Sequence, residues 1–270
     1  MTDEKLGYCG ELVRKYDSDR FLISLVMPPG KRGALWALFA FNHEIAKTRE
    51  VVTETTLGLI RLQWWRDAIE RIYEQGAALQ NEILPDLAQA VNECDLPRSW
   101  FFTMTYGREF DLENVLPASL EGLEKYAEYT HTPLVLLALK VLGQIEKDEV
   151  VTAIAAAYTM TGLMRAVPFY AMQQRCMMPA DLMGRYAVSE RALYALKPEA
   201  GLREVVKAVA ERSQALLAAA KPRGKFLRAM AAVAGLYLKQ IKGMDYDVFN
   251  PRLAQAPAFF HLRFFLKSMF

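Results

Sequence analysis

Apolar residues recur at intervals of three and four residues through most of this chain, and runs of strict apolar–polar alternation are hard to find. The first spacing matches one face of an α-helix, whereas alternation matches a half-buried strand. The chain is therefore predicted to be all-α. The expected helices lie near residues 4–16, 31–47, 57–76, 83–93, 98–109, 119–131, 134–144, 148–170, 201–220, 224–242 and 257–269.

Breaks between these helices carry the expected turn chemistry. Residues 27–33 and 221–225 combine proline, glycine and cations, as helix connections do. No internal repeat and no long polar linker divides the 270 residues, which are enough for one large core. We expect a single domain over residues 1–270 that ends in an amphipathic helix over residues 257–270.

Composition excludes several classes of protein. The formal net charge is only +2, with bases and acids interleaved, so no nucleic-acid partner is expected. Three widely spaced cysteines without a CxxC pair argue against a disulfide framework and a zinc site. The first residues lack the pattern of a signal peptide, and no stretch approaches the roughly 20 apolar residues of a membrane span. We expect a cytoplasmic location.

The helix near residues 57–76 carries a wide apolar surface on one side and alternating charges on the other. Residues four apart on such a face are neighbours. The spacing predicts ion pairs between Arg66 and Glu70 and between Asp67 and Arg71.

Three segments occur in a characteristic order: "DSDRFLISLVMPPGKRGALWALFAFN", "IRLQWWRDAIERIY" and "GLMRAVPFYAMQQRCMMPADLMGRYAVS". Together they resemble the squalene/phytoene synthase family, the head-to-head prenyl synthases, over roughly residues 8–245. The resemblance implies a single all-α domain with the isoprenoid (terpenoid) synthase fold around a central cavity. It also implies two aspartate-rich motifs on facing helices that bind magnesium and prenyl diphosphates.

The first aspartate-rich motif is largely missing. Residues 46–50 read Ala-Lys-Thr-Arg-Glu where the family carries Asp-Asp-x-x-Asp, and His43 stands where the family has an arginine. Departure of pyrophosphate requires neutralisation of several negative charges, which magnesium supplies when carboxylates hold it. A cation about 4 Å from another costs on the order of 4 kcal/mol at an effective dielectric of 20. We do not expect this site to assemble the magnesium cluster.

The second motif and the diphosphate-binding serines also depart from the family pattern. Arg165 is retained, but Ala166 and Tyr170 stand at the two aspartate positions, and Gly162 replaces an asparagine. Of a serine pair that helps to hold the diphosphate, Ser18 matches one member, and Arg20 replaces the other.

A narrower resemblance fits these departures. "AFNHEIAKTREVVTETTLGLIRLQWWRDAIERIY", "YAEYTHTPLVLLALKVLG" and "MDYDVFNP" resemble a non-catalytic branch of the family found in mitochondria and related bacteria. That branch implies a role in the assembly of respiratory complex I (NADH:ubiquinone oxidoreductase) and a protein partner in that membrane complex. It implies a location peripheral to the inner membrane, on the cytoplasmic or matrix side.

Two enzymatic alternatives stay open. The first is an active head-to-head prenyl transferase with a divergent magnesium site, and only in that case is a cofactor expected. The second is unrelated chemistry in the same cavity, because one fold hosts many activities. No catalytic or metal-ligating residue is assigned.

A metal-free ligand site is a further hypothesis. If the cations face the family's cavity, they could bind a prenyl diphosphate or an anionic lipid head directly. The candidate contacts are Ser18, Arg20, His43, Lys47, Arg49 and Arg165. In the alternative, His43 is packed against other side chains, and Lys47 points to solvent while the cavity is filled. Glu44 and Glu50 would then be salt-bridged or solvated. Arg165 and Arg175 would pair with Asp181 and Glu190.

The C-terminal segment "PAFFHLRFFLKSMF" intersperses phenylalanine and leucine with His261, Arg263 and Lys267. This composition suits an interfacial helix on anionic lipid, and it suits packing onto the domain equally well. Apolar residues occupy more than one narrow stripe, which favours burial in the domain or at a partner surface.

Overall fold

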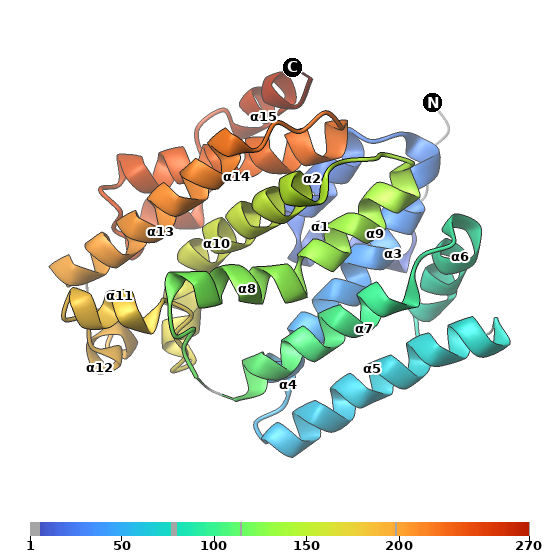
Figure 1. Cartoon of the computed structure of the whole chain (residues 1–270), viewed down its shortest axis with the longest axis horizontal. Coiled ribbons are helices and arrows are strands. Elements are labelled where there is room, and N and C mark those ends of the chain that lie inside the picture. The colour runs from blue at the N-terminus through green and yellow to red at the C-terminus, as the bar shows by residue number, and fades with distance from the viewer. Residues whose placement is uncertain (1–5, 77–79, 114, 198, 270) are drawn as a thin grey trace. The chain divides into compact units, whose positions relative to one another are not determined.

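The computed structural model describes residues 6–76, 80–113, 115–197 and 199–269, which form helices and turns without a β-strand (Figure 1). The all-α prediction is confirmed. The helices are α1 (Tyr8–Tyr16), α2 (Ser18–Leu25), α3 (Pro29–Ala46), α4 (Thr48–Val51), α5 (Thr55–Gln75), α6 (Leu84–Cys94), α7 (Arg98–Gly107), η1 (Arg108–Leu112), α8 (Leu120–Thr130), α9 (Thr132–Leu142), α10 (Asp148–Met172), α11 (Ala180–Arg185), α12 (Glu190–Tyr194), α13 (Ala200–Ala219), α14 (Lys225–Gly243), η2 (Pro251–Ala254) and α15 (Phe260–Met269).

The sequence patterns did not predict α2, α4, α11, α12 or η2, all of eight residues or fewer. A periodic pattern has little statistical weight over two turns or less. The predicted connection at residues 27–33 is also shorter than expected, because α3 begins at Pro29. Proline is well tolerated at the first position of a helix, where its missing N–H would have no helical partner.

The chain divides into two compact units, Met1–Glu113 with Tyr129–Ile145, and Asn114–Glu128 with Glu146–Phe270. Each unit is described by itself below. The expectation of a single domain over residues 1–270 stays a prediction.

In the first unit, α3 lies at the centre and packs against α1, α2, α6 and α9. Its residues 35–42 are all buried, so the helix is apolar nearly all round, as expected for a central helix. Phe41 meets Trp65 of α5 and Phe101 of α7 edge-to-face, with ring centroids 5.5 Å and 5.4 Å apart. These aromatic contacts join α3 to the α5–α7 pair.

The ion pairs predicted along α5 are wrong. Arg66 pairs with Glu109 at 2.7 Å, Glu70 pairs with Arg98 at 2.5 Å, and Asp67 accepts a hydrogen bond from Gln63 at 2.7 Å. Long side chains reach the neighbouring α7–η1 segment, which packs against α5. Tertiary partners therefore replace the neighbours that helical spacing alone offers.

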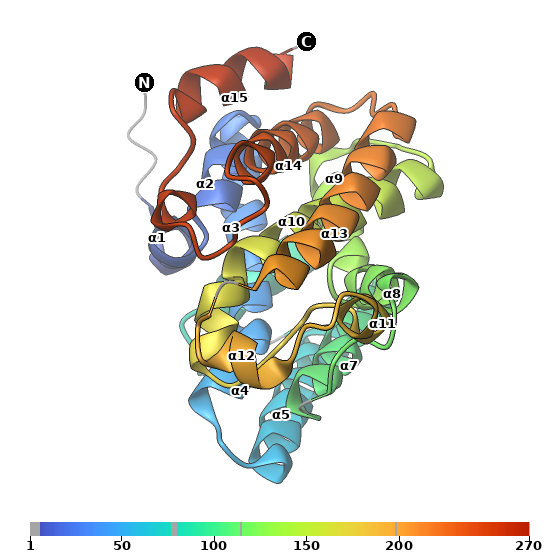
Figure 2. The ribbon, with the colours of Figure 1, turned by 90° about the vertical axis from the view of Figure 1, so that its left-hand side faces the viewer.

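In the second unit, α10 lies against α13 and α14, and α15 packs on α14 (Figure 2). Contrary to the sequence analysis, α10 is long and apolar enough to cross a membrane by length and composition, and it is the one such helix among the described residues. Of its most apolar window, 61% is buried inside the protein. A buried core helix passes the same test, so this feature is weak evidence for a span.

Candidate functional site

The first-motif positions lie at a break between two helices. Helix α3 ends at Ala46, Lys47 follows, and α4 begins at Thr48. The backbone N–H of Lys47 still donates to the carbonyl of His43 at 3.0 Å, which closes the last turn of α3. Residues 46 and 50 thus belong to different helices, and they do not share one continuous helical face.

Glu44 sits between two cations. Its side chain is buried, its Oε1 accepts from the ammonium of Lys47, and its Oε2 accepts from Nη2 of Arg61 at 2.8 Å. Arg61 is a residue that the sequence analysis left out of the site. Only the Glu44–Lys47 spacing of three residues signalled this cluster, because Arg61 arrives from α5.

Arg49 holds the connection between α4 and α5. Its Nη1 donates to the carbonyl oxygens of Thr53 at 3.2 Å and Val52 at 3.5 Å. Three buried polar atoms nearby have no hydrogen-bond partner among the described residues: Oγ1 of Thr48, Nε of Arg49 and Nε of Arg61. Two of the three can only donate, so this region has more donors than acceptors.

Arg20 is engaged at the start of α2. Asp17 caps this helix by accepting from the backbone N–H of Arg20 at 3.1 Å, and its other carboxylate oxygen pairs with the Arg20 guanidinium. That guanidinium also lies 5.9 Å from the ring centre of Phe39. Arg20 is only 8% exposed, whereas Ser18, the first residue of the same helix, is exposed.

The histidines in this unit favour the neutral form. His43 stacks on Tyr16 with ring centroids 4.9 Å apart. Burial lowers the pKa of His43, and Lys47 lowers it further, against the opposing effects of Glu44 and Asp17. These shifts make His43 a poor counter-ion for an anion near neutral pH.

The Nδ1 of His131 lies 2.9 Å from the hydroxyl of Thr130. Burial lowers the pKa of His131 well below its usual value, and the charges of Arg108 and Arg20 add to that effect. Arg108 in turn donates to Asp111 and to Asn42, both at 3.3 Å. The sequence analysis did not single out Arg108, Asp111 or Asn42, which are brought together only by folding.

Arg165, the sixth candidate, belongs to the second unit and lies on α10. Its guanidinium is 3.4 Å from the ring centre of Tyr237, a residue of α14. Positions 162, 166 and 169 lie on one face with Arg165, and they hold glycine, alanine and phenylalanine. A Cβ at Gly162 would meet no atom within 4 Å, so space remains where the family carries asparagine.

The residues at these positions do not fit a magnesium cluster. Mg²⁺ needs oxygen ligands, and at least one or two carboxylates usually supply them. The carboxylate of Glu44 already binds two cations, and Glu50 lies exposed on another helix. Throughout residues 6–76, 80–113, 115–197 and 199–269, no three His, Cys, Asp or Glu side chains group as metal ligands would.

Comparison with known proteins identifies the class. A sequence model of the squalene/phytoene synthase family matches residues 13–259, and the chain belongs to that family. A squalene synthase of Alicyclobacillus acidocaldarius superimposes with a TM-score of 0.75 at 18% identity, over 88% of this chain and 93% of that one. A dehydrosqualene synthase superimposes with a TM-score of 0.79 at 16% identity, over 97% and 94%. The chain therefore has the all-α isoprenoid synthase fold.

Among named relatives, the chain is similar to "NADH dehydrogenase (ubiquinone) complex I, assembly factor 6" of Homo sapiens. The two are 30% identical over 270 residues, which cover 97% of this chain and 81% of that protein. The mouse protein of the same name is 31% identical with the same coverage. Phytoene synthase 1 (chloroplastic) of Arabidopsis thaliana is 23% identical over 268 residues, 93% of this chain and 63% of that protein.

Proposed function

We propose that this chain is a non-catalytic member of the squalene/phytoene synthase family that acts in the assembly of respiratory complex I. The observation that carries the proposal is the state of Glu44. This carboxylate, the buried acid next to the altered first motif, is neutralised by Lys47 and Arg61. Similarity to the complex I assembly factors supports the particular role.

The charge of the leaving group is the physical reason for this assignment. Prenyl transfer releases pyrophosphate, and the family's acids recruit the metal that stabilises its charge. Here the first-motif region presents Lys47 and Arg49, and the second presents Arg165 beside Gly162 and Ala166. No metal cofactor is needed for the proposed role. The protein partner lies in the membrane complex, and the chain acts at its cytoplasmic or matrix face, peripheral to the inner membrane.

A ligand is a finer part of the proposal. The surplus of buried donors around Thr48, Arg49 and Arg61 supports a metal-free contact with a prenyl diphosphate or an anionic lipid head. The proposed contacts remain Ser18, Arg20, His43, Lys47, Arg49 and Arg165. Of these, Arg20 and Lys47 would exchange an acid partner for the ligand. Titration calorimetry with farnesyl diphosphate in magnesium-free buffer tests this part. Arg49→Gln should weaken binding, and absence of heat with the unaltered protein removes the idea.

Turnover is the direct test of the non-catalytic assignment. The protein is incubated with farnesyl and geranylgeranyl diphosphates, with and without Mg²⁺ or Mn²⁺, while pyrophosphate release and C30 or C40 products are followed. We expect neither. Metal-dependent product would establish the alternative, an active head-to-head prenyl transferase with divergent ligands.

The assembly role is tested in the source organism. Deletion of the gene should lower NADH:ubiquinone oxidoreductase activity of its membranes while succinate oxidation, measured in the same membranes, stays unchanged. Complementation with the unaltered chain should restore the activity. Equal loss of both activities, or no loss of either, would contradict the role in complex I.

A further inference from the structure

Helix α15 has apolar residues on two faces. Phe260 and Phe264 are buried, and the ring of Phe260 lies 5.1 Å from that of Tyr237 on α14. The opposite side leaves three large side chains exposed, Leu262 (60%), Phe265 (51%) and Leu266 (52%), and Phe259 (79%) is exposed just before the helix. One stripe therefore packs onto the domain, as one of the two alternatives left open by the sequence required. The interfacial alternative stays a prediction for the stripe that faces outward.

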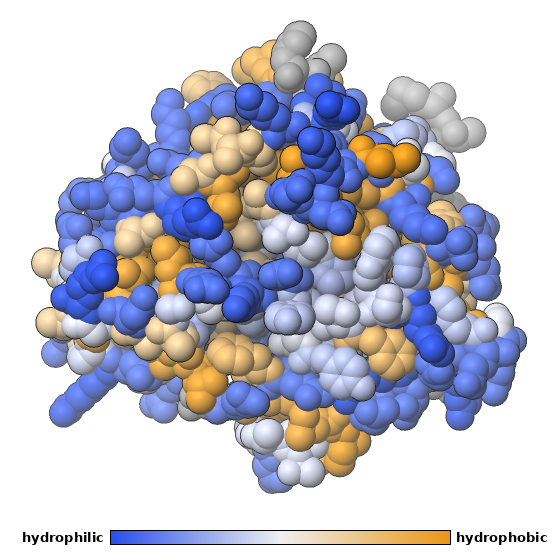
Figure 3. All heavy atoms as spheres, in the orientation of Figure 1, coloured by the Kyte–Doolittle hydropathy of each residue, from blue (hydrophilic) through white to orange (hydrophobic). Residues whose placement is uncertain are grey.

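The outward stripe of Leu262, Phe265 and Leu266 has the spacing of one helical face, with intervals of three and four residues. Hydrophobic and hydrophilic spheres lie side by side at the upper edge of the molecular face in Figure 3, where α15 lies in Figure 1. His261 and Lys267 are exposed on the same helix. An apolar stripe flanked by basic side chains is typical of helices that lie in a membrane interface.

The surrounding sequence is strongly basic. Residues 212–270 contain ten Lys or Arg and two Asp, although the whole chain has a net charge of only +2. Helices α14 and α15 contain no acidic residue. Positive charge is thus concentrated in the segment that presents the exposed stripe.

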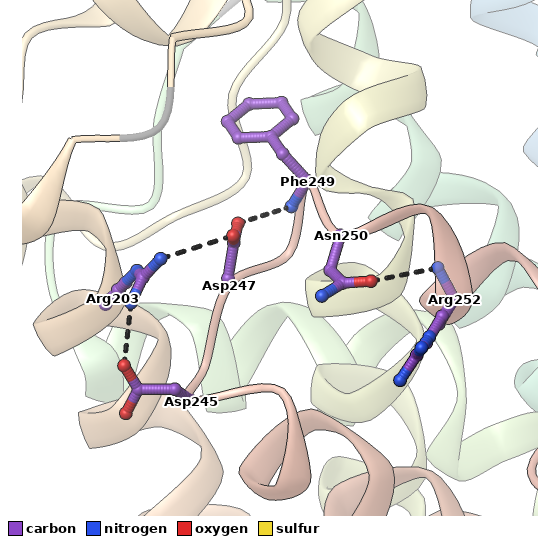
Figure 4. Close-up of polar contacts among 6 residues, drawn as sticks. All are labelled: Arg203, Asp245, Asp247, Phe249, Asn250 and Arg252. Carbon is purple, nitrogen blue, oxygen red and sulfur yellow. Dashed lines mark hydrogen bonds and ion pairs between the residues drawn. The ribbon is translucent and has the colours of Figure 1, made fainter.

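Both aspartates of this segment pair with an arginine that lies outside it. Arg203 of α13 pairs with Asp245 at 2.7 Å and with Asp247 at 3.3 Å (Figure 4). Asp247 also accepts from the backbone N–H of Phe249 at 3.1 Å. In Figure 4 no dashed line joins Arg252 to either aspartate. The aspartates therefore pair with Arg203 and not with the cations near α15.

A surface hollow of about 420 Å³ lies between the end of α14 and the start of α15. Lys239, Arg252 and Arg263 line it, and none of the described residues around it is acidic. The side chain of Gln240 holds the segment around Arg252 and Gln255 against α14, because its Nε2 donates to the backbone carbonyl oxygens of Arg252 at 3.0 Å and Gln255 at 3.1 Å. Among the described residues, no carboxylate pairs with any of the three cations, so they can meet an external anion.

We propose that the exposed face of α15 and this hollow bind the surface of a bilayer that contains anionic phospholipid. The stripe of Leu262, Phe265 and Leu266 enters the boundary between head groups and acyl chains together with Phe259, which precedes the helix. The cations of the hollow contact lipid phosphates. A membrane fits better than a protein groove because these three cations line the hollow beside the stripe, and α14 and α15 contain no acidic residue. The inference deepens the proposed peripheral location by naming the surface that contacts the membrane, and it does not rest on the role in complex I assembly.

Vesicle flotation of the full chain tests the apolar stripe. The protein should float with phosphatidylcholine vesicles that contain phosphatidylglycerol and should not float with phosphatidylcholine alone. Leu262→Glu should abolish flotation, because a carboxylate would enter the interface. The matched control is Ile60→Glu on α5, since Ile60 is also an aliphatic helix residue that is 60% exposed. Ile60→Glu should float normally.

A second pair of variants tests the hollow. Lys239→Gln with Arg252→Gln should weaken binding by about fivefold per cation, as expected for basic residues near an anionic surface. Lys125→Gln with Lys207→Gln removes the same net charge from α8 and α13 and should have a smaller effect. Equal effects of the two pairs would overturn the assignment of the hollow, because they would indicate general charge attraction.

Insertion can be read directly with Phe265→Trp. Lipids brominated on their acyl chains should quench this tryptophan but not the one in Ile60→Trp, after subtraction of the native tryptophan signal. Three results would overturn the proposal: no flotation with anionic vesicles, equal loss in Leu262→Glu and Ile60→Glu, or sedimentation showing that the face pairs with a second copy instead. None of these results bears on complex I activity in a deletion strain, so the two proposals fail separately.

Discussion

Replacement of Glu44 by glutamine should lower the free energy of unfolding by about 2–3 kcal/mol. The carboxylate neutralises Lys47 and Arg61, whose side chains are 27% and 31% exposed, while its own is 11% exposed. Exposed pairs contribute about 0–1 kcal/mol, whereas loss of one partner of a buried pair costs about 3–5 kcal/mol. The Glu44 cluster lies between these limits. Glutamine keeps an acceptor oxygen but leaves the two cations without a counter-charge.

Thermal unfolding followed by circular dichroism measures this loss. At about 2–4 °C per kcal/mol for a chain of this size, the midpoint should fall by about 5–10 °C. The matched control is Glu11→Gln in the same unit. Glu11 pairs with Arg14 at 2.5 Å, but their side chains are 49% and 56% exposed, so its loss should change the stability by less than about 0.5 kcal/mol.

A double-mutant cycle with Lys47→Met tests the cause. If the cost arises from cations left without a counter-charge, Lys47→Met should be less harmful in the Glu44→Gln background than in the original protein, with a coupling energy above about 0.5 kcal/mol. Strict additivity would refute this reasoning. Equal stability of Glu44→Gln and Glu11→Gln would refute the assignment of Glu44 as the centre of the cluster.

Three other outcomes are expected. Burial lowers the pKa of His131 in the folded state, so the unfolded chain binds the proton first as the pH drops. The free energy of unfolding should therefore fall by about 1.4 kcal/mol per pH unit below about pH 6.5. Urea unfolding at several pH values measures this, and a free energy that does not change with pH would contradict it. Gly201→Ala should lower the free energy of unfolding by about 1–3 kcal/mol, because a Cβ there overlaps a backbone carbonyl oxygen. The control Gly235→Ala has open space and should raise the free energy of unfolding by about 0.5–1 kcal/mol in the same assay. Arg165→Lys should lower the free energy of unfolding, measured by chemical denaturation, by about 1 kcal/mol, because an ammonium does not stack flat on Tyr237. An unchanged free energy of unfolding would indicate that the stacking contributes little.

The helical class and the approximate limits of the long helices can be predicted from the order of residues alone. Their apolar spacing extends over many turns, as in α5, α10, α13 and α14, so it stands out from chance. The family could also be inferred from the sequence, because the order of its motifs can be read along the chain. The missing acids at residues 46–50 and at positions 166 and 170 are read directly from the chain.

Which charged side chains pair depends on how the helices pack. Arg61 reaches Glu44 from α5, Arg66 turns to Glu109 instead of Glu70, and neither contact has a fixed spacing along the chain. Short helices such as α4 exist because neighbouring segments hold them, and isolated segments of that length are not stable.

The C-terminal helix shows the same division. The sequence of residues 257–270 specified an amphipathic segment with too many apolar residues for one stripe. It could not specify which of them would be covered, because that depends on where α14 lies. Packing on α14 buries Phe260 and Phe264 and leaves Leu262 and Phe265 exposed, since residues two apart on a helix point to different sides.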